Sequence, residues 1–139
     1  MLPASSTSIG RASGGLIYLD TNALLWIAGA PDQLSPSAIE AVNAAEALHV
    51  SPMVELEVEY LYEIGRIRRD AAAVMSHLAA VIPLRVCDRR FSAVVQAARA
   101  MTWTRDPFDR LITAQAAIGD DTLLTRDATI RAHYPRALW

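Results

Sequence analysis

Four acidic residues lie where an ordinary globular chain would place apolar or neutral ones: Asp20, Glu57, Asp109 and Asp127. Asp20 and Asp127 each end a short apolar run with the pattern of a strand, whereas Glu57 and Asp109 lie within helical patterns. If the fold brings these carboxylates together, they repel one another strongly unless a cation lies between them. The pattern therefore predicts a divalent metal site, and metal-assisted hydrolysis of a phosphodiester as its chemistry.

Glu57 is the most informative of the four. At about 100° per residue along a helix, its neighbours on the same face are mostly apolar: Met53, Val54, Tyr60, Leu61 and Ile64. Three other glutamates form a separate stripe that is predicted to face solvent: Glu55, Glu59 and Glu63. An unpaired carboxylate among apolar side chains is costly. Glu57 is therefore predicted to be functional, and the structural alternatives are a salt bridge to an arginine or a helix rolled enough to expose the side chain.

Two of the other acids have a purely structural alternative. Asp106, Pro107 and Asp109 match the N-cap, first and third positions of a helix. Acidic side chains at this end of a helix accept hydrogen bonds from free backbone amides and interact favourably with the helix dipole. Asp106 is interpreted as the cap itself, and Asp109 is either structural or part of the site. Asp127 could likewise cap the helix that follows it.

Asp20 is harder to explain as a structural residue, because it ends a wholly apolar strand. Thr21 and Asn22 follow it directly, and both side chains can orient a carboxylate by hydrogen bonding. The chain's histidines show no ligand spacing and are expected to be structural or exposed: His49, His77 and His133.

The composition limits the possible classes of protein. The chain has 139 residues, the size of one domain, and 53% of them are hydrophobic. A net charge of −2 argues against binding nucleic acid through bulk charge. All 13 basic residues are arginine, and the absence of lysine excludes P-loop NTPases and Schiff-base enzymes.

The ends and the cysteine content bear on location. Residues 1–14 are small and polar, lack the apolar core of a secretion signal, and are interpreted as a mobile tail. No apolar run approaches the length of about 18 residues needed to cross a bilayer, so no membrane association is expected. Cys87 is the sole cysteine, which excludes an intramolecular disulfide and agrees with a cytoplasmic location.

Strand and helix patterns alternate along residues 15–139. Strands are predicted at 16–20, 48–50, 82–86, 122–125 and 136–138, and the one that contains Pro83 should lie at an edge or begin late. Helices are predicted between them, with Asn22, Ser35, Ser51, Asp70, Asp88 and Asp106 as opening residues. This alternation predicts an α/β fold with a mainly parallel sheet, in which ligands bind beyond the carboxyl ends of strands. Asp20 and Asp127 stand at such ends.

Four segments together resemble the PIN-domain ribonucleases, and among them the VapC-type toxins of bacterial toxin–antitoxin pairs. The segments are YLDTNALLW at 18–26, SPMVELE at 51–57, RDPFDRLITAQA at 105–116 and LLTRD at 123–127. The resemblance extends over about residues 16–138. One departure is Val54, where a polar serine is common in relatives.

The resemblance implies a three-layer α/β/α sandwich around a mainly parallel sheet of about five strands. It implies that the acidic cluster binds Mg²⁺ or Mn²⁺ and performs catalysis: Asp20, Glu57, Asp109 and Asp127. Three residues would support these ligands: Thr21, Asn22 and Thr125. Four arginines are candidates to bind the RNA backbone, because guanidinium groups contact phosphate through two hydrogen bonds: Arg66, Arg105, Arg110 and Arg126. The general base would be Asp109 or Glu57.

The same resemblance implies three partners: an RNA substrate, a cognate antitoxin whose helical segment covers an apolar groove, and a second copy of the chain in a homodimer. The helix at 35–47 and the apolar residues Tyr60, Leu61 and Tyr62 are candidates to form that groove. Two alternative functions stay open. One is a catalytically inactive PIN-like module that binds RNA or protein, and the other is a small phosphohydrolase with Asp20 as nucleophile.

Overall fold

The computed structural model describes residue 2 and residues 15–139. The predicted tail, residues 1–14, lies outside the described residues except for Leu2. The side chain of Leu2 is buried against the core, and its carbonyl accepts a hydrogen bond of 3.3 Å from Asn43 Nδ2. Within the described part of the chain, no helix is long and apolar enough to cross a membrane.

One sheet lies at the centre of the molecule, and all of its strand pairs are parallel. Its strands, in the described residues, follow the spatial order β3-β2-β1-β4-β5. Their bounds are Leu16–Leu19 for β1, Ala47–Val50 for β2, Leu84–Val86 for β3, Thr122–Leu124 for β4 and Ala137–Leu138 for β5. The prediction of a parallel sheet is confirmed. The strand next to Pro83 both begins late and lies at the edge, as its missing amide donor predicts.

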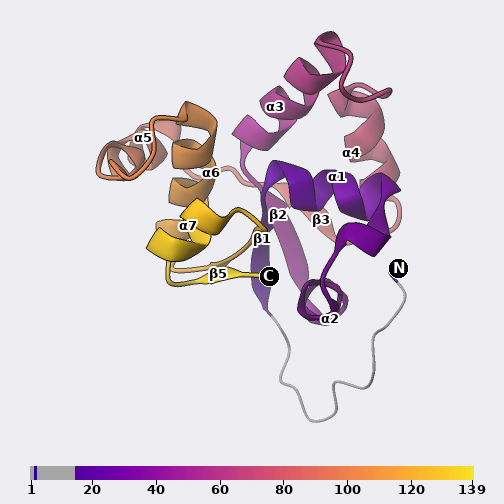
Figure 1. The fold of residues 1–139 in the computed structure, drawn as a ribbon, viewed down its shortest axis with the longest axis horizontal. Coiled ribbons are helices and arrows are strands. Elements are labelled where there is room, and N and C mark those ends of the chain that lie inside the picture. Colours follow the sequence, from indigo (N-terminus) through magenta and orange to yellow (C-terminus); the bar gives the residue numbers. More distant parts are fainter. Residues whose placement is uncertain (1, 3–14) are drawn as a thin grey trace.

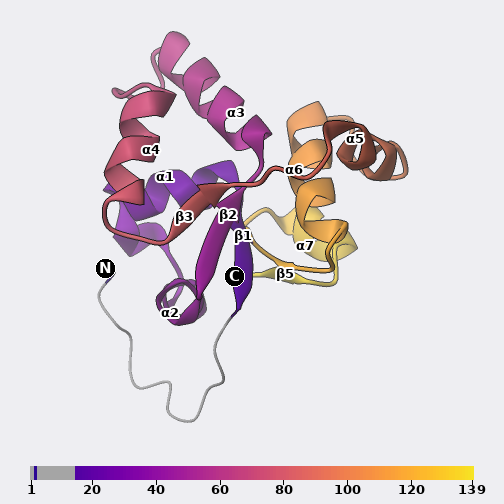
Figure 2. The same ribbon diagram turned by 180° about the vertical axis from the view of Figure 1, so that it is seen from behind.

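Helices cover both sides of this sheet. Their bounds are Thr21–Gly29 for α1, Pro36–Ala44 for α2, Pro52–Glu63 for α3, Ala71–Ala79 for α4, Phe91–Arg99 for α5, Pro107–Ala117 for α6 and Ala128–His133 for α7. A short 3-10 turn, Pro31–Gln33, follows α1. Helices α1 to α4 lie on one side of the sheet and α5 to α7 on the other (Figures 1 and 2). The predicted three-layer α/β/α sandwich is confirmed.

Most helix starts follow the predicted capping residues. Ser35, Ser51, Asp70 and Asp106 all cap their helices through side-chain hydrogen bonds. Two predictions were wrong. Asn22 lies inside α1, because Asp20 caps this helix directly at the end of β1 and no loop intervenes. Asp88 does not open α5, which begins at Phe91 without a side-chain cap.

Two apolar clusters form the described core. The larger one joins the sheet to its covering helices. The smaller one contains Val94, Ala98 and Ala114, and lies between α5 and α6. Helix α5 is the outermost element on its side of the molecule, and α6 separates it from the strands (Figure 1).

Arg89 anchors the carboxyl end of α6. Its guanidinium donates to the Gln115 carbonyl at 2.5 Å and forms an ion pair with Asp121 at 2.9 Å. The same group lies over the ring of Tyr18, 5.2 Å from the centroid. These contacts fix α6 relative to β1, and α6 carries Asp109 at its opposite end.

Candidate active site

Asp20 lies at the carboxyl end of the central strand. Its amide donates to the Leu124 carbonyl at 3.2 Å, which ties the end of β1 to the end of β4. Its side-chain Oδ1 accepts a hydrogen bond of 2.8 Å from the amide of Ala23. The residue is 8% exposed. Asp20 is therefore a buried carboxylate held by the start of α1.

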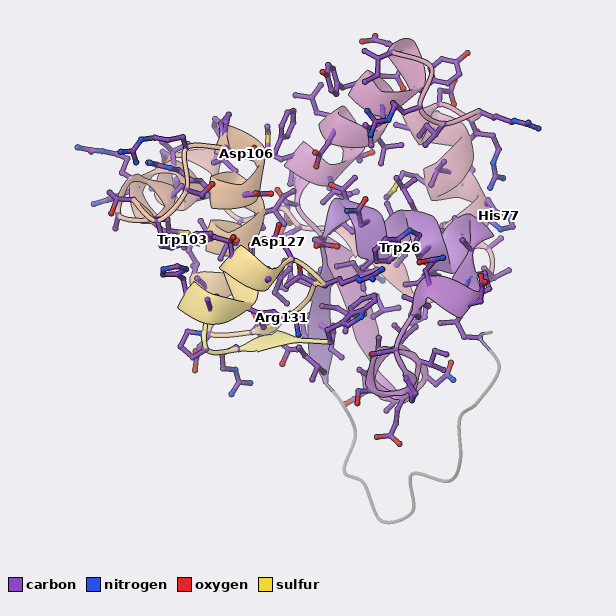
Figure 3. All side chains as sticks on the ribbon, viewed as in Figure 1. Trp26, His77, Trp103, Asp106, Asp127 and Arg131 are labelled. Carbon is purple, nitrogen blue, oxygen red and sulfur yellow. The ribbon has the colours of Figure 1, made fainter. Side chains whose placement is uncertain are left out.

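Asp127 lies just beyond the neighbouring strand. Its amide donates to Thr125 Oγ1 at 3.1 Å, and its side chain caps α7 by accepting from the Ile130 amide at 2.9 Å. The predicted cap is therefore present. The Thr125 hydroxyl also bonds to the Asp20 carboxylate and lowers its pKa. In Figure 3, Asp127 lies between α7 and α1, and Asp106 lies further along, at the start of α6.

Glu57 reaches the same region from α3. Its Oε1 accepts a hydrogen bond of 2.5 Å from the hydroxyl of Thr21, the first residue of α1. Among the ion pairs of the described residues, none joins Glu57 to an arginine, so the salt-bridge alternative has no support. The other alternative, a rolled helix, is partly met, because Glu57 is half-buried and Tyr60 on the same predicted face is exposed. Thr21 thus supports a carboxylate as predicted, although that carboxylate is Glu57 and not Asp20.

The prediction of which face of α3 is buried was partly wrong. Val54 and Val58 are fully buried, Glu57 is half-buried at the border, and Tyr60 and Ile64 are 49% and 48% exposed. The carboxyl half of α3 extends beyond the sheet (Figure 1), so its predicted apolar face is only partly covered there. The predicted solvent stripe also fails at Glu59, whose Oε1 accepts from the Ala71 amide at 3.0 Å.

Asp109 lies in the first turn of α6, and Asp106 is the cap of that helix. Asp106 Oδ1 accepts from the amides of Phe108 at 2.8 Å and Asp109 at 3.3 Å. The interpretation of Asp106 as a cap is confirmed, and the Asp109 side chain is not needed for that purpose. It is half-buried and faces the other acids.

The four carboxylates line one small cavity of about 70 Å³. They come from four separate segments of the chain and meet where β1 and β4 end. The residues that line the cavity are Asp20, Thr21, Asn22, Glu57, Asp109, Ile112 and Asp127. Ile112, which the sequence analysis missed, is the one apolar member, one helical turn after Asp109. The exposed Asn22 side chain lies at the rim.

Burial and mutual repulsion raise the pKa values of these acids. Burial raises the pKa of Asp20 to about 6, and the charges of Asp127 and Glu57 add to the effect. Burial also raises the pKa of Asp109 to about 7, with Asp106 as the largest of four charged contributors. The pKa of Glu57 rises through burial, although its bond to Thr21 opposes this change. Among the ion pairs of the described residues, none joins a basic side chain to one of these acids, so no direct ion pair offsets their mutual repulsion.

This donor set fits a hard divalent cation by its chemistry, since Mg²⁺ and Mn²⁺ favour carboxylate oxygens. The side chains are not yet arranged as a finished coordination shell. Across residues 15–139, no three Asp, Glu, His or Cys side chains stand close enough to share one ion. Asp20 and Asp127 instead hold helix amides, and Glu57 holds the Thr21 hydroxyl. Binding an ion therefore requires these side chains to adjust within the cavity.

The candidate arginines fall into two groups. Arg105 and Arg110 bind carbonyls of their own loop, Thr102 and Thr104 respectively, and line none of the described cavities. Arg66 is exposed and lines the pocket next to the carboxylates. Arg126 lies over the Trp26 ring, 5.7 Å from its centroid. Of these four arginines, only Arg66 lines a described cavity next to the carboxylates.

Comparison with known proteins identifies the family. The model of the PIN domain matches residues 17–134. The chain belongs to the PIN-domain family. Among curated proteins, this PIN domain is 32% identical over 123 residues to Ribonuclease VapC22 of Mycobacterium tuberculosis, covering 86% of this chain and 94% of that protein.

Solved structures of distant sequence share the fold of this PIN domain. A toxin–antitoxin complex from Klebsiella pneumoniae superposes with a TM-score of 0.59 at 17% identity, covering 88% of this chain and 96% of the other. VapBC2 from Rickettsia felis, bound to a DNA fragment from its promoter, gives 0.56 at 15% identity and the same coverage. FitAB bound to a DNA fragment gives 0.54 at 17% identity, covering 88% and 93%.

Proposed function

We propose that this PIN domain is a divalent-metal-dependent endoribonuclease and the toxin of a toxin–antitoxin pair. The observation that carries the proposal is the convergence of Asp20, Glu57, Asp109 and Asp127 on one cavity, from segments far apart in sequence. The similarity to a protein named Ribonuclease VapC22 supports the choice of RNA as substrate.

Each carboxylate has a role in this proposal. Asp20, Asp109, Asp127 and Glu57 would hold Mg²⁺ or Mn²⁺, and Thr21 and Thr125 orient two of these carboxylates. When bound, the ion would lower the pKa of a coordinated water and stabilise charge on the phosphate oxygens. Asp109 or Glu57 would serve as the general base. Arg66 and Arg126 contact the phosphate backbone on either side.

The test uses Asp109→Asn in the purified protein. With single-stranded RNA and Mn²⁺, we expect the cleavage rate to fall by at least about 100-fold, as when a positioned acid or base is lost. Asp70→Asn is the matched control, because Asp70 caps α4 through the Ala73 amide and does not line the cavity. Wild-type cleavage by the Asp109 variant, or full cleavage in EDTA, would refute the proposed mechanism.

The inactive-module alternative makes the opposite prediction about metal binding. A domain that only binds RNA or protein gains no thermal stability from Mn²⁺, whereas the proposed enzyme does. The phosphohydrolase alternative has less support, since Asn22 stands where a second aspartate would be needed and the Asp20 carboxylate already binds a helix amide.

The proposed antitoxin site lies along the outer part of α1. Two adjoining cavities of about 340 and 360 Å³ share Ala28 and Gly29, and most of their lining is apolar. We assign them to an apolar helical segment of the antitoxin, in keeping with the toxin–antitoxin complexes that share this fold. Ala28→Arg should abolish co-purification with the co-expressed cognate antitoxin and leave RNA cleavage intact. Retained co-purification would exclude this site.

The proposed homodimer would use α3. Leu56, Tyr60 and Ile64 are exposed and recur every fourth residue, so they form one apolar line on this helix. Tyr60→Glu should convert the dimer to a monomer in analytical ultracentrifugation. An unchanged sedimentation coefficient would show that this line is not the interface.

A further inference from the structure

A second pocket adjoins the carboxylate cavity and shares Asn22 with it. Its volume is about 340 Å³, and its lining is Asn22, Leu25, Trp26, Leu61, Arg66 and Ile67. We propose that this pocket binds one unpaired nucleobase of the RNA strand whose phosphodiester lies in the carboxylate cavity. This inference rests on the proposed function and adds a base-specificity site to it.

The walls of the pocket suit a planar apolar ligand. Leu25, Leu61 and Ile67 supply aliphatic surface from α1, α3 and the segment after α3. Trp26 supplies an indole that is already held in place by its neighbours. Arg126 lies over its ring at 5.7 Å, and the Trp139 ring lies 5.5 Å from it between centroids. Single-stranded nucleic acids bind through such aromatic and apolar contacts with unstacked bases.

Two polar groups at the pocket can recognise a nucleotide. The Asn22 side chain is exposed and carries one acceptor and two donors, which allows paired hydrogen bonds to a base edge. Arg66 is exposed on the other side and can pair with a phosphate. Arg68 and Arg69 line the next cavity along α1, so positive charge continues away from the acids.

The position of the pocket favours a nucleobase over a side chain of a protein partner. Asn22 lines both the pocket and the carboxylate cavity, so a strand with its phosphate among the acids places a neighbouring base at this opening. The cavities assigned to the antitoxin lie further along α1, and neither of them shares a lining residue with the carboxylate cavity. A protein side chain in the pocket is the competing outcome of the test.

The test measures RNA binding without cleavage. Fluorescein-labelled hexaribonucleotides of A, U, C or G are titrated with the protein in EDTA at low salt, and fluorescence anisotropy gives the dissociation constant. Each strand is then replaced by versions that carry one abasic ribose at successive positions. We expect an abasic ribose at one position to weaken binding about tenfold, the size of one base contact.

Filling the pocket should remove the loss of affinity that an abasic ribose causes. The substitutions Leu61→Trp and Ile67→Trp fill the pocket from two different walls, and either variant should bind intact and abasic strands with equal affinity. Ile118→Trp is the control, because Ile118 is exposed at the end of α6 and lines none of the described cavities. Melting temperatures show which variants are folded.

Three outcomes overturn the proposal: no RNA binding by the wild type, no position sensitive to base removal, or unchanged base dependence in a folded filled variant. If Leu61→Trp loses co-purification with the antitoxin but keeps base-dependent RNA binding, the pocket belongs to the protein partner. Because the assay contains no metal, it is separate from the cleavage test. The cleavage mechanism can fail while base binding stands, and the reverse is also possible.

Discussion

Replacing Asp20 by asparagine should stabilise the metal-free protein while it abolishes cleavage. Asparagine has nearly the same shape and is an equally good helix N-cap, so its Oδ1 can still accept from the Ala23 amide at the start of α1. Asp20 is only 8% exposed, and its charge is repelled by Asp127 and Glu57. The substitution removes that charge. A gain in stability with loss of activity is typical of residues kept for function.

The size of the gain follows from the pKa of Asp20. Burial raises this pKa from 3.8 to about 6, and a rise of about two corresponds to about 3 kcal/mol. The folded state therefore binds this proton more tightly than the unfolded state does. As the pH rises from about 4 to 6, the folded state must lose a proton that it holds tightly, and wild-type stability decreases. The asparagine side chain in D20N carries no such proton, so this variant escapes the decrease.

Urea unfolding in EDTA at a series of pH values measures the effect. We expect D20N to exceed the wild type by about 2 to 3 kcal/mol at pH 8, and this difference to approach zero near pH 4. D70N tests the same cap exchange on α4, outside the acidic cavity, and should not gain stability at pH 8. A D20N protein that is less stable at pH 8, or a difference that does not vary with pH, would refute the argument that repulsion and burial strain this site.

Three further results are expected. Mn²⁺ should raise the melting temperature of the wild type but not that of Glu57→Gln, as followed by scanning calorimetry; equal shifts in both proteins would place the ion elsewhere. Thr21→Val should weaken Mn²⁺ binding about tenfold by calorimetric titration, because it removes the 2.5 Å hydrogen bond to Glu57, and Thr21→Ser should restore it. Arg89→Met should lower the free energy of unfolding by about 2 kcal/mol, since Asp121 and a helix carbonyl lose their donor. Arg90→Met, at an exposed neighbour, should have little effect, and equal losses in both variants would contradict the assigned role of Arg89.

The sequence predicted the sheet and the converging acids well, because both depend on strong local patterns. Short apolar runs between capped helices define parallel strands, and Asp20 and Asp127 stand at their ends. Details of how strands pass into helices were less predictable. The N-cap of α1 is Asp20 rather than Asn22, since the chain turns from β1 into α1 without a loop. Three successive polar residues offer no sequence signal that separates these alternatives.

Glu57 was selected for a reason that proved only partly right. The helical wheel treats α3 as covered along its whole length, but Tyr60 and Ile64 lie on the part that extends past the sheet. Burial of a helix depends on how far its neighbours reach, and that is a tertiary property. The pocket around Trp26 and Leu61 was not predicted for the same reason, because its walls come from α1 and α3 and no pattern in either segment reveals it.

The separate small cluster of α5 has a consequence for motion. Val94 and Ala98 of α5 pack mainly against α6, so α5 can detach without opening the larger core around the strands. Such a unit opens at a lower free energy than the whole fold. Among helices α1 to α6, amide hydrogen exchange should therefore be fastest in α5. A ligand that binds only at the strand ends would leave the exchange rate of α5 unchanged.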